Sequence, residues 1–174
     1  MLRLMLLRHA KSARPPGVDD HERPLAERGR QAAPLIGRHM AGNGLVPDLA
    51  IVSSARRAQE TWALVAQSFA TSIVRRDEAR IYEAAPAAIL SVIREVEPEI
   101  ATLVLVGHNP GFERLAAELI GGGNEADRAR LAEKYPTAGL AVIDFDANRW
   151  SDVGRADGTL VAFVTPKSLG GEDD

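Results

Sequence analysis

LMLLRHAKS occupies residues 4–12 and changes character within a single residue. Its first four residues are large and apolar, a pattern typical of a strand that is buried on both faces of a parallel sheet. Arg8 and His9 follow directly, so the strand carries two polar side chains at its carboxyl end. Ligands of open α/β sheets bind outside the carboxyl ends of the strands. The pair is therefore a candidate functional pair if the strand is central, and two ordinary solvent-facing residues if it is not.

The bulk composition is that of one globular domain. The chain has 174 residues, of which 45% are hydrophobic and 26% are charged, and these proportions suit a single domain with its own core. We expect one domain over residues 1–168 and a frayed tail over residues 169–174. The chain has no cysteine, which excludes disulfides, thiolate catalysis and cysteine-bound zinc.

Charge and hydropathy restrict the partners. The formal net charge is −3 at pH 7, whereas a protein that binds nucleic-acid backbones usually carries a basic excess. The longest apolar runs fall far short of the ~20 residues that span a bilayer, and Arg8 interrupts the N-terminal run too early for a signal peptide. We expect a cytoplasmic protein with no nucleic-acid or membrane partner, in which any bound anion is held by a local cluster of cations.

Strand and helix patterns alternate along the chain and predict an α/β fold with a mostly parallel, mixed sheet flanked by helices. Pro34 is expected to kink the first helix or to begin a second piece of it, and Ser53 or Ser54 to cap the second helix. The last two strands are expected to form an antiparallel pair at a sheet edge, and residues 121–124 a turn. The expected strands cover residues 4–7, 48–52, 71–76, 102–106, 139–145 and 159–164, and the expected helices residues 25–40, 55–69, 86–96 and 110–121.

Polar residues follow three of the expected strands at the point where each strand ends. Arg8 and His9 follow the first strand, and the segment SSARR, residues 53–57, follows the second. His108 and Asn109 follow the strand at residues 102–106. Because the carboxyl ends of parallel strands lie at the same edge of a sheet, we expect these groups to meet there.

Arg56 and Arg57 lie in the expected first turn of a helix, where the macrodipole disfavours a cation by a few tenths to ~1 kcal/mol. A bound anion would offset that cost, since helix N-termini and arginine forks both favour phosphate. We expect one of the two arginines to bind an anion and the other to point into water.

Three motifs in this order resemble the histidine phosphatase superfamily, the group that includes the phosphoglycerate mutases. They are Arg8-His9 after a hydrophobic strand, SSARRAQET at residues 53–61, and GHNPG at residues 107–111. The similarity extends from residue 1 to about residue 168. The segment RHAKS, residues 8–12, is most similar to the small phosphohistidine phosphatase branch known as SixA. The resemblance implies a three-layer, phosphoglycerate mutase-like fold and a phosphatase that uses no metal and no cofactor.

The resemblance also implies a role for each matching residue. His9 would be the nucleophile that is transiently phosphorylated. Arg8, Arg57 and a protonated His108 would hold the phosphoryl oxygens and neutralise the charge of the transition state. The partner would be a phosphorylated substrate, with a phosphohistidine-bearing signalling protein as the first candidate. A non-catalytic phosphate-recognition module, a small-molecule phosphomonoesterase and a mutase are the alternatives.

The general acid is left open by the sequence. Larger members of the family use a glutamate after the third strand unit, and Glu83 is the matching residue; an ordinary loop carboxylate is the equal alternative. Imidazole can leave phosphorus already protonated, whereas an alkoxide must take a proton from a positioned acid. A phosphohistidine substrate would therefore depend less on Glu83 than a phosphate ester would.

For the remaining basic residues we expect supporting or structural roles. Lys11 would add positive potential at the mouth of the site or would lie in solvent. His39 is expected to be structural and His21 to be a solvent-facing loop residue. The histidines show no close ligand spacing, so we expect no metal site.

Overall fold

The computed structural model describes all residues from 1 to 174 and contains one seven-stranded mixed sheet. Along the chain the strands are β1 (Leu2–Arg8), β2 (Leu49–Ser53), β3 (Val74–Glu78), β4 (Thr102–Gly107), β5 (Ile120–Gly123), β6 (Leu140–Phe145) and β7 (Gly158–Val164). Across the sheet their order is β3-β2-β4-β1-β6-β7-β5. β1 is central and lies parallel to β4, while β6 runs antiparallel to both of its neighbours, β1 and β7. The predicted α/β class and mixed, mostly parallel sheet are confirmed.

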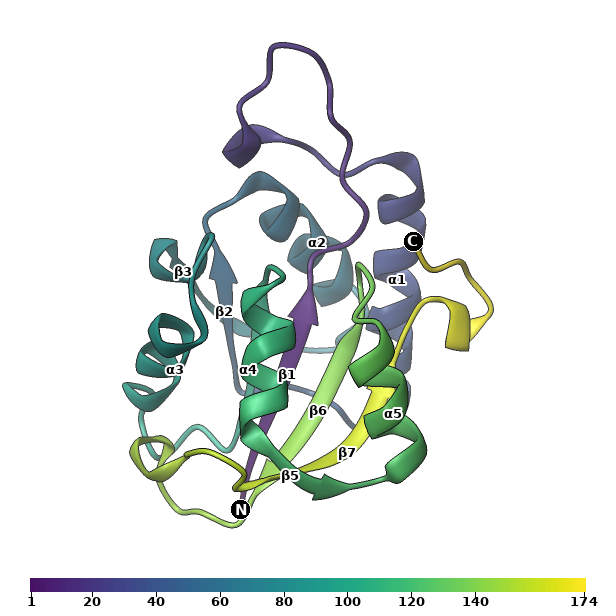
Figure 1. The fold of residues 1–174 in the computed structure, drawn as a ribbon. Helices are drawn as coiled ribbons and strands as arrows, with labels where there is room; N and C mark the ends of the chain where they lie inside the picture. The colour runs from purple at the N-terminus through teal and green to yellow at the C-terminus, as the bar shows by residue number, and fades with distance from the viewer.

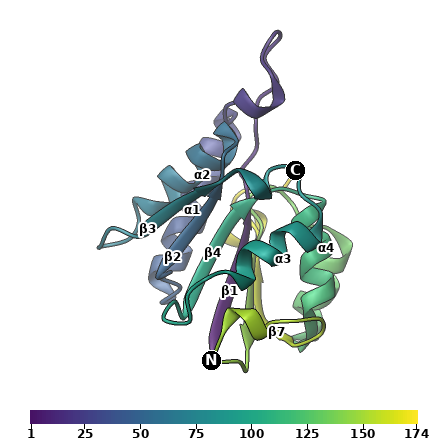
Figure 2. The same cartoon turned by 90° about the vertical axis from the view of Figure 1, so that its left-hand side faces the viewer.

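Helices cover both faces of the sheet and make three layers (Figures 1 and 2). α1 (Glu27–Gly42) and α2 (Arg56–Ala66) pack on one face, and α3 (Pro86–Arg94), α4 (Gly111–Leu119) and α5 (Glu125–Glu133) pack on the other. Four 3₁₀ turns complete the chain: η1 (Asp20–Glu22), η2 (Ala79–Ile81), η3 (Trp150–Asp152) and η4 (Lys167–Leu169). None of the five helices combines the length and the apolar character needed to cross a membrane.

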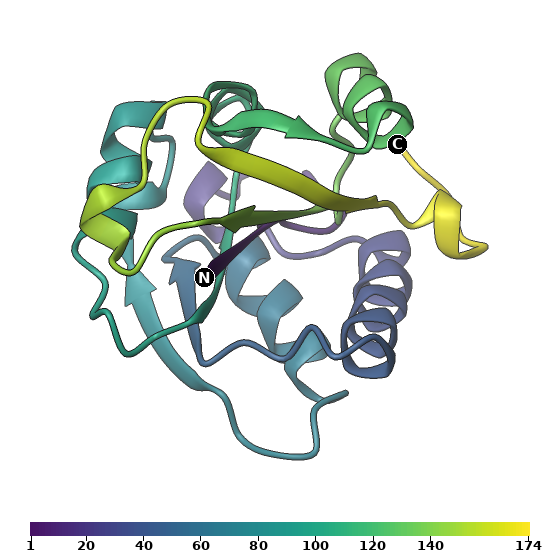
Figure 3. The same ribbon diagram turned by 90° about the horizontal axis from the view of Figure 1, so that it is seen from below.

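β1 contributes to both hydrophobic cores because successive side chains of a strand point to opposite faces. Leu4 and Leu6 belong to the core under α3, α4 and α5, and Met5 and Leu7 belong to the core under α1 and α2. All four side chains are fully buried. The apolar run at the start of the chain therefore reflects burial on two sides, as predicted, and Figure 3 shows the sheet between its two helical layers.

Several element boundaries differ from the prediction. α1 is one helix that includes Pro34, so this proline neither begins nor ends a helix. α2 begins after Ala55, which occupies the N-cap position and has no side-chain acceptor, so neither Ser53 nor Ser54 caps the helix. The Ser53 hydroxyl lies against His108 Nε2 and accepts a hydrogen bond from the Ala55 amide. α4 begins at Gly111, since Pro110 occupies the N-cap position. β3 lies three residues further along the chain than expected, and its side chains are mostly exposed.

The end of the chain was predicted least well. Residues 120–123 form the edge strand β5 rather than a turn, so the pair β6–β7 is not at the edge. Glycines carry no strand propensity, which is why this strand left no pattern. α5 was missed because Leu131 is its only buried residue; its signal was Asn124, whose side chain accepts a hydrogen bond from the Asp127 amide as an N-cap. Residues 169–174, expected to be frayed, make defined contacts that are described below.

The connection from β1 to α1 rises beyond the carboxyl edge of the sheet (Figure 1). Its two ends are tied by a bridge between Ser12 and Leu25, and η1 lies within it. The backbone of the connection lies directly against α1 at Gly29. A Cβ atom added at this position would lie 2.1 Å from the Lys11 carbonyl oxygen. The backbone can approach the helix this closely only because the residue is glycine.

Candidate active site

The sheet register places three polar strand ends side by side. Arg8 pairs with Gly107 at the ends of β1 and β4, and Val52 pairs with Val106 on the other side of β4. A cavity of about 240 Å³ lies at this edge. All five predicted site residues line it, together with other polar side chains; the lining consists of Arg8, His9, Lys11, Ser12, Arg14, Asp20, Arg23, Arg57, Glu83, His108, Asn109, Thr137 and Asp174.

His9 follows β1 and is held in a defined orientation. Its Nδ1 lies 2.7 Å from the carbonyl oxygen of Ala10, which can only accept a hydrogen bond. The proton of a neutral ring is therefore on Nδ1, and Nε2 carries the lone pair. Burial, together with the nearby charges of Arg57 and Arg8, lowers the pKa of His9 to about 3. His9 is consequently neutral across the physiological range, with the lone pair of Nε2 free.

His108 follows β4 and packs against His9, with 5.2 Å between the ring centroids. Its Nε2 lies 2.7 Å from the hydroxyl oxygen of Ser53, and its Nδ1 is buried without a partner. Burial, followed by the charge of Arg57, lowers the pKa of His108 to about 3. The sequence analysis expected a protonated His108 with a phosphoryl group bound; in the free protein, burial and the charge of Arg57 favour the neutral ring.

Arg8 and Arg57 bring two guanidinium groups to the cavity. Arg8 donates through Nη1 to the carbonyl oxygen of Tyr135 at 3.0 Å. Arg57 is 5% exposed and is held by its Nη1, which donates to the Asp20 carbonyl oxygen at 2.7 Å. Arg56, in contrast, points outward and pairs with Glu60. The expectation that one arginine of the pair faces water and the other faces an anion site agrees with this arrangement.

Three buried side-chain nitrogens have no hydrogen-bond partner anywhere in the structure, and all three belong to this site. They are Nε of Arg8, Nε of Arg57 and Nδ1 of His108. A buried polar group without a partner costs about 1–3 kcal/mol, more if charged. Their concentration around one small cavity is the property expected of a preformed anion-binding site, whose ligand supplies the missing acceptors.

Asp20 lines the cavity and was not singled out by the sequence analysis. Its carboxylate accepts hydrogen bonds from Arg57 Nη2 at 3.1 Å, from Arg23 Nε at 3.1 Å and from the Tyr82 hydroxyl at 2.5 Å. The bond from Tyr82 and the contacts with Arg57 hold the pKa of Asp20 far below its usual range. Burial and the same bond raise the pKa of Tyr82 to about 12. The network connects the β1–α1 connection to the anion site.

The sequence offers one weak indication of Asp20 and Arg23: both lie in the charged segment DDHER, residues 19–23, within the β1–α1 connection. Nothing local connects that segment with Arg57, which is 37 residues away. His21, expected in solvent, packs edge-on against Tyr82 and lies 2.9 Å from the Ser54 hydroxyl through Nε2.

Glu83 reaches the cavity from the turn after η2. Its φ of 50° is in the left-handed region, which costs a residue with a Cβ atom about 1–2 kcal/mol. Backbone strain of this kind gathers at functional sites. The structure thus brings the predicted candidate acid to the site.

Comparisons with known proteins agree with this geometry. Residues 4–80 match the family model of the histidine phosphatase superfamily, branch 1. The chain is 39% identical over 163 residues to an uncharacterised protein of Mycobacterium tuberculosis, covering 92% of this chain and 100% of that one.

Two solved structures are similar over nearly the full length. A candidate phosphohistidine phosphatase SixA from Agrobacterium tumefaciens is 32% identical, with a TM-score of 0.80 over 95% of this chain and 98% of that chain. The corresponding candidate from Nakamurella multipartitia is 25% identical, with a TM-score of 0.83 over 95% of this chain and 96% of that chain.

A seven-stranded α/β sheet with an arginine–histidine pair at the end of its central strand defines a phosphatase class, and the chain belongs to the histidine phosphatase superfamily. Within that superfamily it is of the SixA type, as the TM-scores of 0.83 and 0.80 with the two SixA structures show. Membership of this family implies a phosphatase.

Proposed function

We propose that this protein is a metal-independent phosphatase that works through a phosphohistidine intermediate on His9, with protein phosphohistidine as its substrate class. The observation that carries the proposal is the convergence of the chain's three unpartnered buried nitrogens with the free Nε2 of His9 on one cavity. A tetrahedral phosphoryl group has the acceptor oxygens that the two arginine Nε–H groups lack, and it can also accept from His108 Nδ1 when the Ser53 hydroxyl donates to Nε2 and leaves the ring proton on Nδ1.

The proposed reaction has two steps. His9 Nε2 forms a bond to phosphorus as the bond to the leaving group breaks, and the leaving group takes up a proton. Water then attacks the phosphohistidine, phosphate departs and His9 is restored. Arg8, Arg57 and His108 would hold the phosphoryl oxygens in both steps, which stabilises the charge that spreads over them in a loose transition state.

A protein substrate fits the size and openness of the site. The lining is made almost entirely of polar side chains, so there is little apolar wall to enclose a small organic molecule. The connection between β3 and α3 is brief and holds only η2 and a short turn. The similar structures from Agrobacterium tumefaciens and Nakamurella multipartitia, described as candidate phosphohistidine phosphatases, support the same substrate class.

Replacement of the nucleophile tests the mechanism. His9→Ala should lower the hydrolysis of an aryl phosphate by several orders of magnitude, because removal of a nucleophile leaves only binding and charge stabilisation. His39→Ala is the matched control, since His39 is only partly buried, lies outside the cavity and has its side-chain hydrogen bond with Asn43. EDTA should leave the rate of the unsubstituted protein unchanged.

A phosphodonor experiment separates the enzyme from a phosphate-recognition module. Incubation with a labelled phosphodonor should leave acid-labile, base-stable label on the protein and none on the His9→Ala variant. Full activity of His9→Ala, or reversible binding of the donor without turnover or label, would overturn the proposal.

A further inference from the structure

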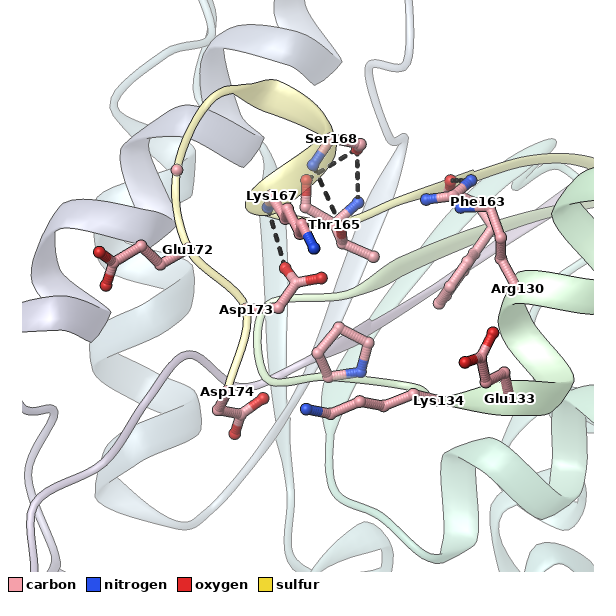
Figure 4. Close-up of a pocket in the computed structure, with 12 residues that line it drawn as sticks. Arg130, Glu133, Lys134, Phe163, Thr165, Lys167, Ser168, Glu172, Asp173 and Asp174 are labelled. Carbon is pink, nitrogen blue, oxygen red and sulfur yellow. Dashed lines mark hydrogen bonds between the residues drawn. The ribbon is translucent and has the colours of Figure 1, made fainter.

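A second and larger cavity, of about 800 Å³, adjoins the phosphate site. Figure 4 shows it between α5, the end of β7 and the last residues of the chain. Asp174 lines both cavities and therefore lies where the two meet. We call the larger part the C-terminal groove; it is lined by Arg130, Glu133, Lys134, Pro136, Phe163, Thr165, Lys167, Ser168, Gly171, Glu172, Asp173 and Asp174.

The lysines of the chain are concentrated around this depression. The sequence contains only three, Lys11, Lys134 and Lys167, against eighteen arginines. Lys11 lines the phosphate cavity, and Lys134 and Lys167 line the C-terminal groove. Neither Lys134 nor Lys167 forms an ion pair with another side chain, and the single ion-pair contact of Lys11 is with Asp174 at 3.9 Å. These ammonium groups are therefore available to an anionic partner.

An acidic segment of the same chain, Glu172-Asp173-Asp174, lies in the groove. Asp174 accepts a hydrogen bond from the Thr137 amide at 3.0 Å, and Asp173 accepts one from the Lys167 amide at 2.9 Å. In Figure 4 the ammonium groups of Lys134 and Lys167 lie on the side of the groove where these two carboxylates are, while Glu172 points away from it.

The acidic segment cancels a local positive charge. Of the charged residues that line the groove, the segment supplies three carboxylates, and the other walls supply three cations and a single anion, Glu133. Arg130 is used internally, since its Nη1 donates to Asp127 and to the Phe163 carbonyl oxygen. Without the segment, the groove would hold two lysines, Lys134 and Lys167, against the single carboxylate of Glu133, a local positive excess in a chain whose net charge is negative.

We propose that the C-terminal groove is the docking site for an aspartate- and glutamate-rich segment next to the phosphorylated residue of a protein substrate. The Glu172-Asp173-Asp174 segment occupies it in the free protein as an internal competitor. This inference rests on the proposed phosphatase function and extends it by naming what flanks the phosphoryl group. Attraction of an acidic partner by clustered lysines raises the association rate and is weakened by salt.

Two matched phosphohistidine peptides test the proposal, one flanked by Asp and Glu and the other by Asn and Gln. The unsubstituted protein should show a higher kcat/KM for the acidic peptide, and this preference should shrink with added salt. The double variant Lys134→Gln, Lys167→Gln should lower kcat/KM for the acidic peptide about three- to tenfold, as expected for the loss of two partly exposed charge pairs, and should leave the neutral peptide unchanged.

Two further variants complete the design. Asp173→Asn removes the competing carboxylate that lies at the Lys167 amide and should raise kcat/KM for the acidic peptide alone. Arg38→Gln with Arg155→Gln is the charge-matched control, because both arginines are exposed and line neither cavity. The hydrolysis of an aryl phosphate, which has no flanking segment, should stay the same in every variant.

The outcomes distinguish the docking proposal from the proposed function. If the aryl phosphate is hydrolysed but the ratio of acidic to neutral peptide is the same in the lysine variant and the arginine control, the docking site is wrong and the phosphatase stands. If the unsubstituted protein hydrolyses neither peptide nor the aryl phosphate, both proposals are wrong. An acidic preference that the lysine variant abolishes and the acidic-segment variant enhances is the expected result.

Discussion

At the scale of single residues, the site is an arrangement of donors that are held in place before any ligand arrives. The Ala10 carbonyl orients His9, the Ser53 hydroxyl orients His108 and the Asp20 carbonyl orients Arg57. The supports come from the last residue of β2 and from the β1–α1 connection. Preorganised donors stabilise developing charge without a cost of reorganisation at the moment of reaction.

Asp20 places a negative charge beside an arginine that is expected to bind phosphate. Asp20→Asn should tighten inhibition by tungstate, a tetrahedral oxyanion, about two- to fivefold, because a repelling carboxylate is removed from a partly exposed position. The same change should lower kcat about tenfold, since Arg57 loses part of its orientation.

Tyr82→Phe is the matched control for this prediction. It removes the hydrogen bond to Asp20 without a change of charge, so it should lower kcat slightly and leave tungstate inhibition as it is. Inhibition constants and kcat values from steady-state kinetics provide both readouts. Unchanged tungstate inhibition in Asp20→Asn would contradict the repulsion.

The contribution of Glu83 to the rate of hydrolysis is expected to depend on the leaving group of the substrate. Glu83→Gln should lower the hydrolysis of an alkyl phosphate about 10²- to 10⁴-fold, the usual contribution of a general acid. It should lower the hydrolysis of a phosphohistidine peptide less than tenfold, because imidazole can leave with its proton already in place. A comparison of kcat for the two substrates measures the difference; equal losses would assign Glu83 to binding or to structure.

At the scale of elements, the site depends on how the β1–α1 connection rests on α1. The closest approach is at Gly29, where a Cβ atom would lie 2.1 Å from the Lys11 backbone oxygen. Backbone cannot move aside as the end of a flexible side chain can, so the helix or the connection would have to shift. That connection also carries Asp20, which links its position to the anion site.

Gly29→Ala should therefore lower the free energy of unfolding by about 1–3 kcal/mol, the usual cost of overpacking. Gly42→Ala in the same helix is the control, because its Cβ atom would meet nothing within 4 Å. That change should be neutral or stabilising by up to about 1 kcal/mol, since alanine has the higher helix propensity. Urea unfolding of both variants measures the effects. Equal stabilities would contradict the prediction, since they would show that the connection moves aside without a cost in free energy.

At the scale of the whole molecule, two neutral histidines are buried in a cationic environment. The pKa of His9 and the pKa of His108 are each lowered to about 3 in the folded protein, chiefly by burial. An unfolded chain binds protons at both residues near pH 6.5. Between about pH 6.5 and pH 3 the unfolded state therefore holds more protons than the folded state, and folding is disfavoured as the pH falls.

The free energy of unfolding should consequently decrease as the pH is lowered from 7 to 4, with a slope of at most about 2.7 kcal/mol per pH unit from the two histidines. Above pH 7 this contribution should vanish, since both states are then neutral at these positions. Urea midpoints at several pH values give the slope. The double variant His9→Gln, His108→Gln should show a clearly smaller slope; the same slope in this variant would contradict the assignment to these residues.

The sequence by itself determined the central strand, the order of most elements and the residues that meet at the strand ends. Those features are local or periodic: four apolar residues before Arg8 predict a strand buried on two faces, and parallel strands necessarily end at one edge. A helix without an apolar stripe, such as α5, and a glycine-rich edge strand, such as β5, leave no such pattern and were missed.

Only the tertiary structure decided which groups support or oppose the anion site. Asp20 reaches Arg57, Ser53 bonds His108, and the segment Glu172-Asp173-Asp174 lies among the lysines, in each case across tens of residues of chain. The neutral state of His108 was decided in the same way, since its pKa depends on burial and on the charge of Arg57. Such contacts arise from packing and electrostatics between distant segments, and no local pattern of residues records them.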